Sequence, residues 1–131
     1  MTRSIIESSK VPSPVGPYSQ AVSCGSILFI SGQIPLDPAS GEMVGNSFAE
    51  QCHRVLLNLK IILEEGGSGL DSVLKVTIYM KNLAQFGELN EIYSEYFDVS
   101  KPARACVEVS NLPKGAYVEM DAIAEISSVN K

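Results

Sequence analysis

The segment 47–65 has the most regular pattern of apolar and polar positions in the chain. Its apolar residues recur every three or four positions and form one stripe: Phe48, Cys52, Val55, Leu56, Leu59, Ile62 and Leu63. Ser47 and Glu50 have the spacing of a capping box, and Gly66 with Gly67 supplies a stop signal. We therefore expect a helix over this segment, with one face packed on a core.

A second, shorter helix is predicted over residues 83–97. Its packed side carries Phe86, Leu89, Tyr93 and Phe97. Asn90 lies one turn after Phe86 and one turn before Tyr93, toward this packed side. Because a buried amide needs hydrogen-bond partners, Asn90 either ties down a loop or belongs to a site.

Strands are predicted where apolar residues alternate or form short runs, at 18–22, 26–31, 73–80, 103–109 and 117–126. The segment 11–17 contains three prolines and is expected to be an extended loop. The resulting order, β-β-α-β-α-β-β, indicates an α+β fold in which two helices cover one face of a mixed sheet. With 131 residues, the chain has room for one domain, 1–131.

The other face of the predicted sheet has no helix left to cover it. In the strand 103–109, Ala103, Ala105, Val107 and Val109 point one way, and Arg104, Cys106 and Glu108 point the other way. We expect Arg104 and Cys106 on the uncovered face, with Tyr79. Such a face is either solvated or buried against another copy of the chain, and the mixed residues favour the second alternative.

Composition narrows the class of protein. The chain is 45% apolar and 19% charged, as in folded globular proteins, and has no stretch near the ~20 apolar residues of a membrane span. The N-terminus has no apolar segment typical of a secretory signal, which predicts a cytoplasmic protein. The net charge of −5 disfavours nucleic acid as a partner.

Metal and disulfide chemistry have little support in the sequence. Cys24, Cys52 and Cys106 are scattered, with no Cys-x-x-Cys pair, so reduced thiols are expected. His53 is the only histidine and is interpreted as a surface residue of the first helix. No metal or cofactor is therefore predicted, and a nucleophilic Cys106–His53 pair has little support.

Two charged residues are the main candidates for chemistry. Arg104 lies mid-strand between two alanines, which leave room for a planar guanidinium that can bind a carboxylate through two hydrogen bonds. A structural ion pair is the alternative. Glu119 is a carboxylate in an apolar strand, and partial desolvation suits it to act as a base toward water. A solvated strand face, shared with Asp121 and Glu125, is its alternative. If the last two strands form a hairpin, Glu119 lies opposite residue 107 or 108.

Five sequence blocks resemble the Rid (YjgF) family, in the same order: Pro14-Val-Gly-Pro-Tyr-Ser-Gln-Ala21, Ile30-Ser-Gly-Gln-Ile-Pro35, Pro102-Ala-Arg-Ala-Cys-Val-Glu-Val109, Leu112-Pro-Lys and Val118-Glu-Met-Asp-Ala-Ile-Ala124. The resemblance covers almost the whole chain. It implies a chorismate-mutase-like fold and a homotrimer with clefts between subunits. It also implies hydrolysis of 2-iminobutanoate and 2-iminopropanoate to 2-oxo acids and ammonia, without cofactor or metal.

The resemblance also implies which residues form the site. Arg104 would bind the carboxylate of a small 2-imino or 2-oxo acid, with Cys106 and Gly32 lining the pocket. Glu119 would activate water, and Tyr18 and Asn90 would hold water and substrate. Ala105 stands where the family commonly has Ser or Thr, and the link from the second helix to Pro102 is short, which affects the expected substrate range.

Two other functions stay open from the sequence. Some members of the family are described as ribonucleases that inhibit translation, although the acidic charge and single histidine disfavour this activity here. The other alternative is a trimer without catalysis that binds small carboxylates or holds unfolded chains.

Overall fold

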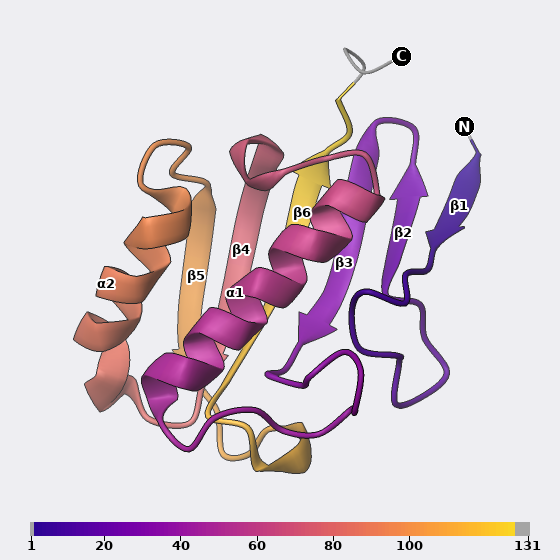
Figure 1. Ribbon diagram of the computed structural model, residues 1–131. Coiled ribbons are helices and arrows are strands. Elements are labelled where there is room, and N and C mark those ends of the chain that lie inside the picture. The colour runs from indigo at the N-terminus through magenta and orange to yellow at the C-terminus, as the bar shows by residue number, and fades with distance from the viewer. Residues whose placement is uncertain (1, 128–131) are drawn as a thin grey trace.

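The computed structural model describes residues 2–127, so the ends of the predicted domain, residues 1 and 128–131, lie outside the described residues. One six-stranded sheet has the order β1-β2-β3-β6-β4-β5. The strands are β1 (Arg3–Ile6), β2 (Ala21–Cys24), β3 (Ile27–Gln33), β4 (Val73–Met80), β5 (Ala103–Glu108) and β6 (Val118–Glu125). The helices α1 (Phe48–Glu65) and α2 (Phe86–Phe97) lie on the same face of the sheet (Figure 1). The predicted α+β class, with two helices on one face of a mixed sheet, is confirmed.

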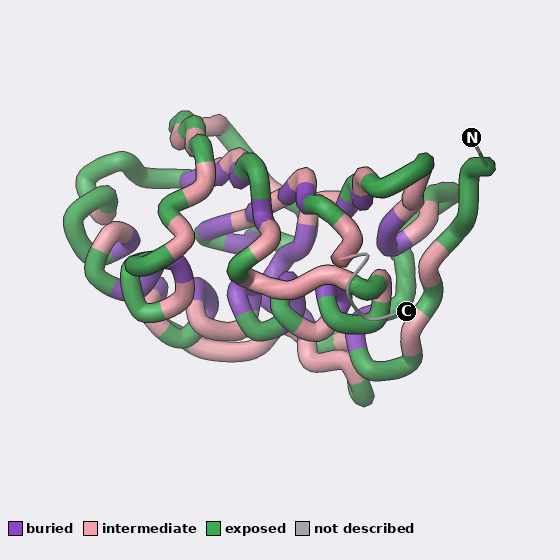
Figure 2. Tube along the Cα trace, turned by 90° about the horizontal axis from the view of Figure 1, so that it is seen from above, coloured by how far each residue is buried: buried purple, intermediate pink, exposed green. Residues whose placement is uncertain are grey.

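Helix α1 begins and ends at the predicted signals. The Ser47 hydroxyl accepts a hydrogen bond from the Glu50 backbone N–H at 3.2 Å, and the Glu50 carboxylate accepts one from the Asn46 N–H at 3.0 Å. After the helix, Gly67 has φ +85°, a backbone conformation that favours glycine. Its apolar stripe is buried against the sheet, and Figure 2 shows the buried positions gathered in the interior of the molecule.

The N-terminal strand was not predicted. Residues Arg3–Ile6 form β1, which pairs antiparallel with β2 at the edge of the sheet. Only four residues long and largely exposed, β1 has no apolar alternation that could mark it in the sequence. The strand predicted at 18–22 is observed at Ala21–Cys24, because residues up to Ser19 remain in the proline-rich loop.

The last two strands do not form a hairpin. Strand β4 lies between them, antiparallel to β6 and parallel to β5, and α2 is the crossover that joins β4 to β5. Glu119 nevertheless has the expected position along the strand direction relative to Val107. Both residues lie opposite Tyr79 of β4.

The uncovered face carries a different set of residues from the one predicted. Arg104 lies beside Val76 and Cys106 beside Ile78, and both partners are fully buried beneath the helices. Arg104 and Cys106 are therefore on the helix-covered face. Ala103, Ala105 and Val107 are exposed on the opposite face, which also carries the half-buried Tyr79. The prediction for this strand was wrong, since at the sheet edge α2 covers the side that carries the polar residues.

Among residues 2–127, none of the helices is both long enough and apolar enough to cross a lipid bilayer.

Candidate functional site

Arg104 is held by two aromatic rings of α2. Its guanidinium carbon lies 4.9 Å from the centre of the Tyr93 ring and 5.4 Å from that of Phe86. Both distances are those of cation–π contacts. Phe86 and Tyr93 are seven positions apart, two helical turns, so both rings project from one side of α2 toward β5. Helix α2 therefore orients the Arg104 side chain of the edge strand β5.

Among residues 2–127, the guanidinium of Arg104 has no acid as a partner. Within the described part of the chain, its N–H groups make no ion pair or hydrogen bond, so the alternative of a structural ion pair is excluded there. Arg104 also borders a cavity of about 210 Å³, the Arg104 pocket, which is lined by Tyr93, Ser94, Phe97, Asp98, Lys101, Pro102 and Arg104. Five N–H donors are thus available to an anion with paired oxygens, such as a carboxylate.

Asn90 and Cys106 lie close to Arg104 in the fold. Asn90 is half-buried, four positions after Phe86 and three before Tyr93, on the side of α2 that carries the two rings. Cys106 lies two residues after Arg104 on the same face, with its Sγ 3.4 Å from Met80 Sδ. Burial raises the pKa of the Cys106 thiol, which disfavours the thiolate form that a nucleophile needs.

Glu119 belongs to a second cavity, on the other face of the sheet. This Glu119 pocket has a volume of about 340 Å³ and is lined by Val15, Tyr18, Ser31, Gly32, Pro113 and Glu119. Three of the predicted site residues, Tyr18, Gly32 and Glu119, therefore come together from a loop and two neighbouring strands.

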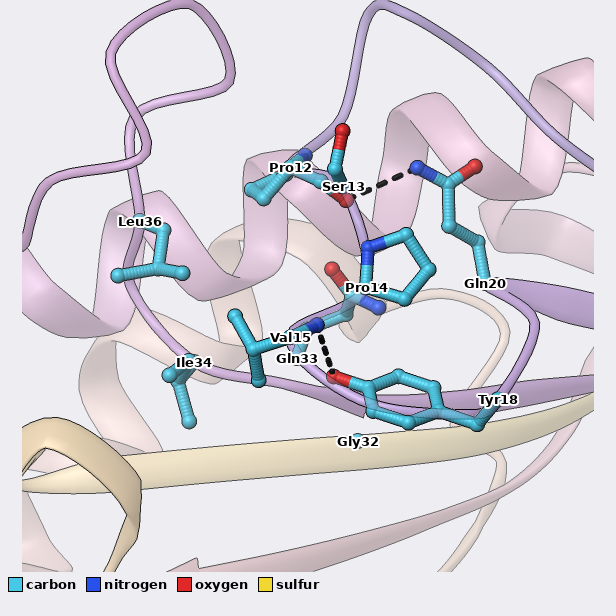
Figure 3. A pocket seen from close by; sticks show the side chains of 10 residues that line it. All are labelled: Pro12, Ser13, Pro14, Val15, Tyr18, Gln20, Gly32, Gln33, Ile34 and Leu36. Atoms are coloured by element: carbon cyan, nitrogen blue, oxygen red, sulfur yellow. Dashed lines mark hydrogen bonds between the residues drawn. The ribbon is translucent and has the colours of Figure 1, made fainter.

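The loop that carries Tyr18 is fixed from both sides. The buried Gln20 amide donates to the Ser8 carbonyl at 3.0 Å. It also donates to the Pro12 carbonyl at 2.9 Å, and the Tyr18 hydroxyl accepts from the Val15 N–H at 3.2 Å (Figure 3). The Ser31 hydroxyl donates to the Ser19 carbonyl at 2.6 Å, which joins the loop to β3. The prolines and these bonds hold the Tyr18 ring beside Gly32.

The electrostatic surroundings of Glu119 suit a base. Burial raises its pKa above the usual value, and the nearby Asp121 carboxylate raises it further. Asp121 accepts a hydrogen bond from the Tyr79 hydroxyl at 2.9 Å, and Tyr79 lies opposite Glu119 on β4. A carboxylate whose pKa is raised binds a proton more strongly, which favours abstraction of a proton from water.

Because Asp121 raises the pKa of Glu119, we expect its removal to shift the pH dependence of the activity. Replacing Asp121 by asparagine removes a negative charge but keeps an oxygen for the Tyr79 hydroxyl. The pKa of Glu119 should fall, so the ionised base should persist to lower pH. For a reaction that needs ionised Glu119, the acid limb of the kcat/KM profile should move to lower pH. An unchanged acid limb would show that Asp121 has no electrostatic effect on the reacting base.

Arg104 and Glu119 cannot reach one small molecule within a single chain. They lie on opposite faces of the sheet, with β4 between their strands. Arg104 is level with Val76 and Ala122, three residues along β6 from Glu119. Their backbones are therefore separated by roughly 10 Å across the sheet, because β4 lies between the two strands. The three residues of rise separate them by roughly another 10 Å along the strands. One chain therefore carries two incomplete halves of the predicted site.

The single histidine lies outside both pockets. His53 is on α1, where its Nδ1 is 2.8 Å from the Tyr96 hydroxyl of α2. It is partly buried between the two helices, so its interpretation as a surface residue was wrong. The described residues contain no cluster of three or more His, Cys, Asp or Glu side chains placed to hold a metal ion.

Sequence reasoning missed the groups that surround the two charged residues. Phe86 and Tyr93 were assigned to packing only, and their contact with Arg104 depends on α2 lying beside β5. Their spacing was visible in the sequence, but the position of β5 at the sheet edge was not. Asp121 was interpreted only as a sign that Glu119 could belong to a solvated strand face, and it is also a neighbour that raises the pKa of Glu119.

Comparison with known proteins identifies the family of this chain. Residues 8–126 match the family described as Endoribonuclease L-PSP. The chain is 53% identical over 124 residues to a RutC family protein of Pyrococcus abyssi, a match that covers 95% of this chain and 98% of that protein. It is 43% identical over 122 residues to mouse 2-iminobutanoate/2-iminopropanoate deaminase, covering 93% and 90% of the two chains.

A solved structure with the same fold contains a small ligand. The crystal structure of Escherichia coli TdcF with bound serine matches with a TM-score of 0.89 and 38% identity, covering 95% of this chain and 99% of that chain. The chain belongs to the Rid/L-PSP family, and the resemblance seen in the sequence is confirmed.

Proposed function

We propose that this protein hydrolyses small 2-imino acids to 2-oxo acids and ammonia. The observation that carries the proposal is the free Arg104 guanidinium, held over two rings at the border of a cavity. A mouse relative is named for the deamination of 2-iminobutanoate and 2-iminopropanoate, and the ligand of TdcF is serine. These three molecules are small acids with nitrogen on the carbon next to the carboxylate, which suits an arginine fork.

The proposed reaction adds water across the imine. Arg104 binds the substrate carboxylate and thereby orients the adjacent C=N carbon. Glu119 accepts a proton from water as the oxygen attacks that carbon, and Tyr18 and Asn90 hold water and substrate, with Cys106 lining the pocket. Glu119 then returns that proton to the nitrogen of the tetrahedral adduct. As the C–N bond breaks and ammonia leaves, the ionised Glu119 accepts the hydroxyl proton, and the 2-oxo acid remains. The protonated imine is a strong electrophile, so orientation of water supplies much of the rate, and no cofactor or metal is needed.

The opposite faces of Arg104 and Glu119 lead us to propose a homotrimer with clefts between subunits. One chain would supply the Arg104 pocket and its neighbour the Glu119 pocket. The uncovered face supports an interface, because Phe29 is 48% exposed and Val107 is 44% exposed there. We place the trimer in the cytoplasm, where unstable imines from amino-acid metabolism would be cleared.

A coupled assay tests the proposed reaction. Threonine dehydratase generates 2-iminobutanoate, and semicarbazide traps the imine that escapes hydrolysis as a semicarbazone. Adding this protein should lower the rate of semicarbazone formation. The sum of semicarbazone and free 2-oxobutanoate should not change. An unchanged semicarbazone rate would reject hydrolysis and favour a role in carboxylate binding.

A mixed oligomer tests whether two chains complete one site. At substrate concentrations well below the wild-type KM, the Arg104→Ala and Glu119→Gln variants should each be nearly inactive. Co-expression should restore about one quarter of wild-type activity, because random mixing pairs an intact Arg104 with an intact Glu119 at about one site in four. Each variant mixed with itself is the control. Absence of any recovery in a verified mixed oligomer would contradict a site shared between chains.

The family description also names endoribonuclease activity, which has less support in this chain. The only histidine bonds to Tyr96 away from both pockets, and the net charge is −5. An RNA-cleaving activity that survives the Arg104→Ala substitution would belong to another site or to a contaminant.

A further inference from the structure

Gly32 lies directly beside the carboxylate of Glu119. Gly32 is in β3, which neighbours β6, and both residues line the Glu119 pocket. A Cβ atom added to Gly32 would lie 2.9 Å from Glu119 Cδ and 3.3 Å from its Cγ, and closest of all to Oε2. Real Cβ atoms essentially never approach another heavy atom within 3.0 Å. The Glu119 side chain therefore occupies the space that a side chain at position 32 would need.

The backbone itself does not require glycine at this position. Gly25, Gly41 and Gly67 have positive φ values, whereas Gly32 does not have φ in the left-handed region. An alanine at position 32 would therefore be free of backbone strain. The absent side chain, rather than an unusual conformation, is what this glycine contributes.

The atoms that an added methyl group would meet belong to the flexible end of Glu119. No backbone atom is among the three nearest neighbours of that Cβ. Relief of the clash therefore moves the carboxylate and leaves the sheet in place. On its other side, Glu119 faces Tyr79, whose hydroxyl is bonded to Asp121. A displaced carboxylate must move toward this pair or out into the cavity.

We propose that Gly32 is a positioning residue: its bare backbone seats the Glu119 carboxylate where that group activates water. The proposal rests on the proposed function, because it assigns Gly32 an action through Glu119. A methyl group at position 32 displaces the base while Arg104, on the opposite face, is untouched. The loss therefore falls on kcat and spares the binding of the substrate carboxylate.

The test is Gly32→Ala measured in the semicarbazide assay. A displacement of about 1 Å at a reacting group costs roughly 100-fold, so kcat should fall by about that factor while KM changes little. Gly69→Ala is the matched control, since a Cβ there meets no atom within 4 Å, and it should keep wild-type kinetics. The thermal midpoint of Gly32→Ala should stay close to wild type. Wild-type kcat in a folded Gly32→Ala variant would overturn the proposal.

Two further measurements separate this proposal from the proposed reaction. The NMR titration curve of the Glu119 carboxyl group should change in Gly32→Ala whether or not the protein hydrolyses imines. A titration curve identical to that of the wild type would overturn the proposed positioning role of Gly32. In a Glu119→Asp background the shorter side chain leaves room at position 32, so adding Gly32→Ala should reduce kcat much less than about 100-fold. An undiminished loss there would mean that Gly32 acts independently of Glu119, which also overturns the proposal. If wild-type protein fails to clear imine but the titration changes, only the proposed reaction is rejected.

Discussion

Replacing Glu119 by glutamine is expected to lower kcat for imine hydrolysis by about 10²–10⁴-fold. Glutamine has the same shape and keeps the contacts of the side chain with Gly32 and its β-sheet neighbours. It cannot accept a proton from water, so only the step that needs a base is lost. Steady-state kinetics in the semicarbazide assay measures the effect.

A second carboxylate on the same strand provides the control for the Glu119→Gln result. Glu125 lies on the same face of β6 as Glu119 but is exposed at the strand end. Glu125→Gln removes one equal charge and should retain wild-type kcat. A Glu119→Gln variant with wild-type kcat would remove Glu119 from the mechanism and leave water without an identified base.

Replacing Arg104 by alanine is expected to lower kcat/KM by roughly 30- to 1,000-fold, mainly through KM. This range corresponds to about 2–4 kcal/mol for the loss of a charge-assisted, two-point contact with the substrate carboxylate. Arg104→Lys should recover only part of the activity, because an ammonium group keeps the charge but lacks the planar fork. Steady-state kinetics of both variants checks the order wild type, lysine, alanine.

The fold should survive the loss of Arg104. Its cation–π contacts with Phe86 and Tyr93 contribute about 0.5–1 kcal/mol at a site of this exposure. A change of this size lowers the thermal midpoint by a few degrees at most in a chain of this length. Arg3→Ala, on the exposed strand β1, is the control for the loss of a positive charge. Wild-type imine clearance by Arg104→Ala would end the assignment of this residue to substrate binding.

Periodic segments of the fold could be predicted from sequence because their signals are local. The stripe of α1, its capping residues and its terminal glycines are all set within about twenty positions, and the observed helix begins and ends at those signals. Strand β4 was predicted with its observed bounds for the same reason, since its buried residues alternate from Val76 to Met80. Strand β1 was missed because its pairing with β2, rather than any pattern of its own, makes it a strand.

The features of the candidate site also divide into those that local sequence determined and those that depend on tertiary structure. The sequence by itself determined that Arg104, Cys106 and Glu108 share one side of a strand, because successive side chains alternate whatever the surroundings. The resemblance to the Rid family pointed to Tyr18, Gly32 and Glu119, which line one pocket.

Only the tertiary structure decided which side of β5 meets a helix. A parallel pairing with β4, and a crossover through α2, bring Arg104 beneath Phe86 and Tyr93 and leave Ala103 and Ala105 exposed. The alternation of side chains is a property of each strand, whereas the order of strands depends on contacts between segments distant in the sequence. For this reason the residues of the site were visible in the chain, but their separation onto two faces of the sheet was not.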